Sequence, residues 1–140
     1  TGARGGMDRL TQRLGLARRA LAQLDELMGR PLTPIERDAA LQRFEYSCET
    51  VWKLAQLYLR DRECSPAGSP KQIARASGAS GLLDESETAR ALAMADDRND
   101  TVHAYNETLA LIIAARLAAH AALLNAWLDR IAQRLAAPSA

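Results

Sequence analysis

Apolar residues recur at alternating spacings of four and three residues along most of this chain, which is the period of one face of an α-helix. The first such run extends from about Met7 to Met28. A second begins after Thr33, an N-cap residue with Glu36 in capping-box position, and the last occupies residues 109–135. No segment shows the strict alternation of apolar and polar residues that is typical of a β-strand. The pattern therefore predicts an all-α protein.

The interruptions of this pattern divide the chain into four main helices and a short one. The segment CSPAGSP at residues 64–70 ends the second helix, and Ser69 with Pro70 begins a short helix that ends near Ser77. After the turn at residues 78–84, a sparsely apolar helix starts near Glu85, and the last helix carries residues 109–135. Short connections favour antiparallel neighbours, so we predict a four-helix up-and-down bundle with one short additional helix.

The 140 residues, of which 48% are hydrophobic, fit one domain with a buried core. We expect this domain to span residues 7–137, and residues 1–6 to be disordered or a remnant of cloning. The net charge of +1 gives no general attraction to nucleic acid or to an anionic membrane, so such binding would need a local patch. Polar residues such as Arg116 interrupt the most apolar region, and the two cysteines match no disulfide framework. These features predict a cytoplasmic protein without a membrane segment.

The octapeptide RNDTVHAY at residues 98–105 is the strongest candidate for a functional site. If a helix continues through it, Asn99 and His103 lie one turn apart on one face, and Arg98 and Tyr105 lie two turns apart on a neighbouring face. A cation, a titratable imidazole, a carboxamide and a phenol would then share one short segment. A lone histidine in this place could instead be a helix-end residue that is hydrogen-bonded to a carbonyl.

Other chemistry-bearing residues favour structural interpretations. His103 and His120 lie far from the cysteines, so we expect no metal site and no cofactor. His120 has core spacing in the last helix and is expected to be buried with its polar atoms satisfied. The aromatic residues of the second helix have helical spacing and are expected in the core or at an interface. Charge is uneven, since residues 1–19 are basic while residues 84–100 hold six acids against two arginines.

Three segments resemble, in order and at natural spacing, the nucleotidyltransferase substrate-binding protein family of the HEPN superfamily. They are LQRFEYSCETVWKLAQLYLRD at residues 41–61, SPKQIARASGASGLLD at 69–84 and DDRNDTVHAYNE at 96–107. The resemblance implies a helical bundle that forms a homodimer and is encoded beside a minimal nucleotidyltransferase. It also implies that some relatives are toxins of toxin–antitoxin pairs.

The signature of the HEPN superfamily falls on Arg98, Asn99, His103 and Tyr105 of this sequence. In ribonuclease members, the resemblance implies metal-independent RNA cleavage by a His and an Arg that meet from two subunits in the dimer cleft. A histidine can take the proton of a 2′-hydroxyl group, and an arginine can stabilise the charge that builds on the phosphate. In toxin–antitoxin pairs, the resemblance implies that the partner nucleotidyltransferase attaches AMP to the motif tyrosine, which adds negative charge to the cleft.

We therefore expect a homodimeric partner of a minimal nucleotidyltransferase that binds a nucleotide or substrate in a dimer cleft around the motif. The alternative is a metal-independent endoribonuclease toxin with His103 as base and Arg98 as stabiliser of the transition state, neutralised by AMPylation of Tyr105. Asn99 and Asp100 are expected to support the site or to bind the ligand in either case. A purely structural bundle with an incidental motif is a third possibility.

Overall fold

The structure is a computed structural model that describes the backbone of residues 2–137 and the side chains of residues 9–137. Over the described backbone the protein is all-helical, with six α-helices, one 3-10 turn and no strand. The elements are α1 (Gly2–Asp25), α2 (Pro34–Glu63), α3 (Pro70–Ala79), α4 (Glu85–Asp100), η1 (Thr101–His103), α5 (Glu107–Ala114) and α6 (Leu117–Ala136). The prediction of an all-α protein is thus confirmed.

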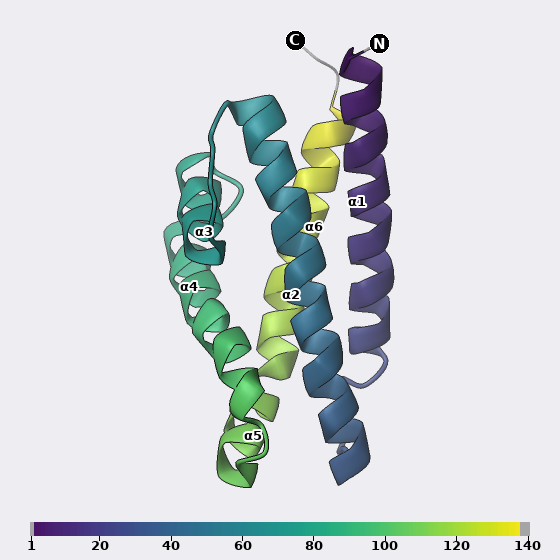
Figure 1. Cartoon of the computed structure of the whole chain (residues 1–140), viewed down its shortest axis with the longest axis vertical. Coiled ribbons are helices and arrows are strands. Elements are labelled where there is room, and N and C mark those ends of the chain that lie inside the picture. Colours follow the sequence, from purple (N-terminus) through teal and green to yellow (C-terminus); the bar gives the residue numbers. More distant parts are fainter. Residues whose placement is uncertain (1, 138–140) are drawn as a thin grey trace.

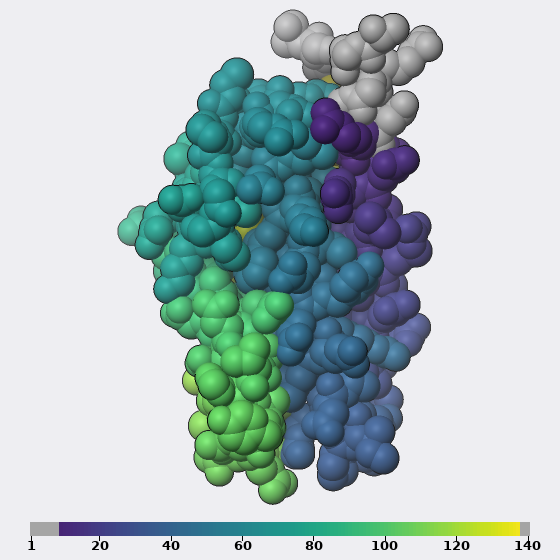
Figure 2. Space-filling model, in the orientation of Figure 1, coloured from purple at the N-terminus to yellow at the C-terminus, as the bar shows by residue number. Residues whose placement is uncertain are grey.

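The long helices lie side by side along the long axis of the molecule (Figure 1). Helices α1, α2 and α6 pack against one another, and α4 contacts α2, α3 and α6. Figure 2 shows the face on which α2 lies between α1 and α3. The core holds side chains from all of the long helices, including the predicted Phe44, Trp52 and Tyr58, whereas Tyr46 is 52% exposed. The core thus fixes how α2 and α4, which carry the candidate site, lie relative to each other.

Three helices start at a capping box. Thr33 Oγ1 accepts the Glu36 amide N–H at 3.2 Å, and Glu36 Oε1 accepts the Thr33 amide N–H at 2.9 Å. Ser69 and Asp84 cap α3 and α4 in the same way. Each box satisfies backbone donors that the first turn of a helix would otherwise leave unpaired. The predicted starts at Thr33, at Ser69 and near Glu85 are therefore confirmed.

The prediction of one continuous helix over residues 109–135 is wrong. The structure divides this segment into α5 and α6, which meet at an angle of 46°. The side chain of Arg116, at the break, donates from Nη1 to Asp97 Oδ1 at 2.8 Å, and the apolar residues on both sides, Ile113 and Leu117, are buried. The bend therefore comes from packing against α2 and α4, and neither proline nor glycine marks it in the sequence.

The first helix begins at Gly2 and not near Met7, where its apolar stripe starts. The expectation that residues 1–6 lie outside the domain stays a prediction, because their side chains are outside the described part of the chain. Within the described residues, no single helix is long and apolar enough to cross a membrane. Helices α5 and α6 meet that criterion only as a bent pair.

Candidate functional site

The RNDTVHAY motif straddles the end of α4, so the predicted arrangement on one continuous helix is wrong. Helix α4 ends at Asp100, and the amide N–H of Thr101 bonds to the carbonyls of both Asp97 and Arg98. Asn106 then takes an extended conformation and caps α5, with its side chain accepting the Leu109 amide N–H at 3.2 Å. A cap at Asn106 requires non-helical backbone before α5, which is why the helix cannot continue through the motif.

Arg98 lies in the last turn of α4 beside a surface hollow between α2 and α4, which we call the Arg98 hollow. Its Nη2 donates to Glu49 Oε1 at 2.9 Å, and its side chain is 21% exposed. Helical spacing favours a pair of Glu49 with Lys53 along α2, but in the structure Glu49 contacts Arg98 across the fold. The hollow has a volume of about 280 Å³. It is lined by Glu49, Trp52, Lys53, Gln56, Gly68, Pro70, Ile73, Arg98 and Asn99.

The Arg98 guanidinium group is only partly satisfied by its carboxylate partner. Its Nε is buried and has no hydrogen-bond partner among the described residues, as is also true of Arg37 Nε. An unsatisfied buried donor costs about 1–3 kcal/mol, so the pair with Glu49 adds less stability than a fully bonded pair would. Behind Arg98, burial raises the pKa of the Cys48 thiol well above its ordinary value, although the charge of Arg98 opposes this rise. The Cys48 thiol is thus neutral, and the cations that line the hollow are Arg98 and Lys53.

His103 and Tyr105 lie beyond the helix end and face solvent. The Tyr105 hydroxyl and His103 Nδ1 are 3.4 Å apart, and the two rings meet edge to face with centroids 5.9 Å apart. Tyr105 is 86% exposed and is therefore not a core residue. If Nδ1 carries the proton and donates to the phenol oxygen, Nε2 of His103 is free to accept a proton.

The motif residues therefore form two pairs in one chain. Arg98 and Asn99 line the Arg98 hollow, whereas His103 and Tyr105 contact each other and do not line it. Asp100 is exposed at the last position of α4. Arg98 and His103 therefore do not line the same hollow within one chain.

A cluster of buried Asp97 and His120 with the exposed Arg116 lies beneath the motif and was not predicted as a unit. Asp97 Oδ2 lies 2.8 Å from His120 Nε2, and Asp97 Oδ1 accepts from Arg116 Nη1 at 2.8 Å. His120 also stacks on Phe44, with ring centroids 5.3 Å apart. The prediction of a buried, satisfied His120 is confirmed, and the cluster ties the last turn of α4 to α6. The sequence did contain a signal for the burial of Asp97, because Asp97 lies three residues after Met94 on the same face of α4.

Over residues 12–133, the sequence matches the family described as nucleotidyltransferase substrate binding protein like. The match covers most of the chain, and the protein belongs to this family. It is similar to a protein from Thermus thermophilus of known crystal structure, with 44% identity and a TM-score of 0.78. That alignment covers 86% of this chain and 99% of the other.

A second solved structure shares the fold at low sequence identity. A chain in a mutant of the toxin–antitoxin complex MntA–HpeT is 16% identical, with a TM-score of 0.74. The alignment covers 90% of this chain and 98% of that chain. No curated protein matches the sequence significantly.

Proposed function

We propose that the protein is the binding partner of a nucleotidyltransferase and that it holds a nucleotide or another anionic substrate at the Arg98 hollow. The observation that carries the proposal is the position of Arg98, whose guanidinium group is held by Glu49 at the wall of a hollow. Asn99 offers amide donors and acceptors beside it. Family membership supports a nucleotidyltransferase as the partner, since the family is named for binding the substrate of such an enzyme.

The fold assignment forms part of the same proposal. We place the chain in the HEPN superfamily, with α1, α2, α4 and α6 as a four-helix up-and-down bundle and α3 as the short additional helix. The similarity to a chain of MntA–HpeT supports this assignment at the level of the fold.

We also propose that the working unit is a homodimer, because one chain keeps the two halves of the motif apart. Exposed apolar side chains gather on η1 and α5 close to His103, namely those of Val102, Leu111 and Ile112, which are 65%, 50% and 45% exposed. Exposed apolar patches of this kind mark interaction surfaces. A two-fold axis near this patch would bring His103 of one subunit toward Arg98 of the other.

Two measurements test these proposals. Calorimetric titration with ATP should show that Arg98→Gln weakens binding while the exposed control Arg90→Gln does not; equal affinity of the two variants would place the nucleotide elsewhere.

Sedimentation equilibrium at micromolar concentration should show a dimer that Ile112→Glu dissociates and Ile35→Glu does not. Ile35 is 82% exposed at the start of α2 and serves as the matched control. If the wild-type protein sediments only as a monomer, a cleft built from two subunits is excluded.

The second candidate function is a metal-independent endoribonuclease, and the solvent exposure of His103 favours it. In this reaction, His103 takes the proton of an RNA 2′-hydroxyl group as its oxygen attacks phosphorus and the bond from phosphorus to the 5′-oxygen breaks. The products are a 2′,3′-cyclic phosphate and a 5′-hydroxyl group that takes its proton from water, and Arg98 of the other subunit stabilises the charge on the phosphate. Expression without the nucleotidyltransferase should then arrest growth. His103→Ala and Arg98→Ala should each relieve the arrest with an unchanged circular dichroism spectrum. Equal growth with wild type and variants would leave the binding partner as the function.

A further inference from the structure

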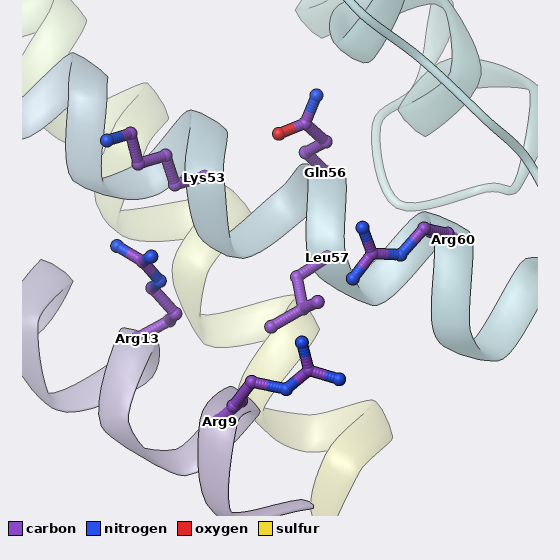
Figure 3. A pocket seen from close by; sticks show the side chains of 6 residues that line it. All are labelled: Arg9, Arg13, Lys53, Gln56, Leu57 and Arg60. Atoms are coloured by element: carbon purple, nitrogen blue, oxygen red, sulfur yellow. The ribbon is translucent and has the colours of Figure 1, made fainter. Parts of the chain in front are cut away.

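Four basic side chains line an open groove between α1 and α2, which we call the basic groove. Arg9 and Arg13 reach from α1, and Lys53 and Arg60 reach from α2 (Figure 3). Gln56 and Leu57 complete its lining, and its volume is about 300 Å³. Arg13 lies opposite Lys53 at one end, and Arg9 lies opposite Arg60 at the other, as the antiparallel course of the two helices requires. The groove thus presents two pairs of cations.

These cations are largely without carboxylate partners inside the described part of the chain. Arg60 contacts its neighbour Asp61 through Nε at 3.2 Å, but no described carboxylate lies within ion-pair distance of Arg9, Arg13 or Lys53. Elsewhere, arginines that lie between helices are neutralised, as Arg130 is by Glu87. Like charges that share a groove repel one another, and a bound anion removes that repulsion. The net charge of +1 therefore conceals a concentrated positive patch.

The basic groove adjoins two other hollows on α2, with which it shares lining residues. Lys53 and Gln56 also line the Arg98 hollow. Gln56 and Arg60 line a third hollow with residues 66–68 and Gln72, of about 450 Å³. Lys53 and Arg60 alone are about 10 Å apart along the helix axis at 1.5 Å per residue. Small-molecule sites are typically enclosed and mostly apolar, whereas the basic groove itself is open and Leu57 is the one apolar residue in its lining.

We propose that the basic groove binds the phosphodiester backbone of a nucleic acid strand, with one phosphate at each pair of cations. The strand then continues over Lys53 and Gln56 to the Arg98 hollow. Trp52 and Leu57 are buried, so the described surface offers no aromatic platform for base stacking here. Contacts to phosphates alone carry no sequence information, and binding is accordingly independent of sequence. This site goes beyond the proposed function and does not depend on the nucleotidyltransferase.

The test is fluorescence anisotropy with labelled strands of about sixteen nucleotides, which is within the range that one binding module covers. One strand is 2′-O-methyl RNA, which lacks the nucleophile for cleavage, and the other is DNA of the same sequence. The groove variant is Arg13→Gln with Lys53→Gln, and the control variant is Arg75→Gln with Arg90→Gln. All four residues are exposed, and the control pair removes the same charge from outside the groove.

Two neutralised phosphates predict that the logarithm of the binding constant falls with the logarithm of salt concentration with a slope of about −1.4. The groove variant should lose one phosphate contact, which gives a slope of about −0.7 and about fivefold weaker binding at 0.1 M salt. Arg9→Gln with Arg60→Gln should do the same at the other end. The control variant should bind as the wild type does. Binding of both strands identifies the backbone as the ligand, and binding of one alone identifies RNA or DNA as its source.

Three results would overturn the proposal. The first is equal weakening by the groove and control variants, which would show diffuse attraction to total charge. The second is the absence of strand binding by the wild-type protein at low salt. The third is displacement of the strand by inorganic tripolyphosphate when both supply the same concentration of phosphate groups. That result would show that the groove binds a small anion. Binding of the nucleotidyltransferase by the groove variant is measured in parallel. If the variant still binds the nucleotidyltransferase, a negative result with the strands contradicts the nucleic acid site alone and leaves the proposed partner untouched.

Discussion

Replacing Glu87 with glutamine would remove one carboxylate from the contact between the start of α4 and α6. Glu87 Oε1 accepts the Asp84 amide N–H at 3.0 Å and also accepts from Arg130 Nη1, and the side chain is only 9% exposed. Arg130 also donates to the Leu82 carbonyl at 2.9 Å. The hydrogen bond from Arg130 and the backbone hydrogen bond at Asp84 lower the pKa of Glu87 from 4.5 to about 2. This contact fixes the end of α4 opposite to the motif.

The size of the effect follows from the pKa. A fall from 4.5 to about 2 corresponds to at most about 3.4 kcal/mol of stability, at 1.36 kcal/mol per pKa unit. Arg130 is 39% exposed and stays partly hydrated, so we expect about 1–2 kcal/mol. Because the pKa is lower in the folded state than in the unfolded state, this stabilisation is complete above pH 4.5 and is lost as the pH falls toward 2.

Urea unfolding between pH 7 and pH 3 measures this contribution. At pH 7 the free energy of unfolding of Glu87→Gln should be about 1–2 kcal/mol below that of the wild type, and the difference should shrink below pH 4.5. Glu85→Gln is the control, since Glu85 is exposed on the same turn of α4. A difference of the same size at pH 3 and pH 7 would refute the reasoning, because it would show that glutamine acts through packing and not through charge.

Three further predictions concern the candidate site. Asp97→Asn should lower the free energy of unfolding by about 2 kcal/mol, because His120 loses a buried charged partner; an unchanged thermal midpoint would contradict this role. Glu49→Gln should strengthen ATP binding in calorimetry, because it frees the Arg98 guanidinium group from its carboxylate, and weaker binding would show that Glu49 is needed to position Arg98. Incubation with the cognate nucleotidyltransferase, ATP and Mg²⁺ should transfer AMP to the Tyr105 oxygen with release of pyrophosphate, and mass spectrometry should find no adduct on Tyr105→Phe.

Sequence reasoning predicted the features that depend on local contacts. The starts of α2, α3 and α4 are set by side chains three residues apart, so Thr33, Ser69 and the turn before Glu85 could be recognised directly. The break between α5 and α6 could not, because it depends on the contact of Arg116 with a residue of another helix. The regular spacing of apolar residues continues through the bend, so the spacing alone does not reveal it.

The candidate site was predictable in its residues but not in its arrangement. Arg98 and Asn99 share a hollow because α2 packs beside α4, and the pairing of Arg98 with Glu49 joins residues 49 positions apart. Helical spacing suggested Lys53, in the same helix, as the partner of Glu49. In the structure, Glu49 pairs with the more distant Arg98. The basic groove shows the same limit. Arg9 and Arg13 lie one turn apart and were visible as basic residues, but their convergence with Lys53 depends on the pairing of α1 with α2.

The two ends of α4 differ in how firmly the sequence specifies them. Its start is locked by a reciprocal pair of side-chain bonds, whereas at its end the amide of Thr101 divides its bond between two carbonyls and a single hydroxyl bonds back to the Arg98 carbonyl. The end of α4 is held instead from other helices, because Arg98 contacts Glu49 of α2 and Asp97 contacts His120 of α6. A substitution in α2 or α6 can therefore displace the motif, although it lies far from the motif in the sequence.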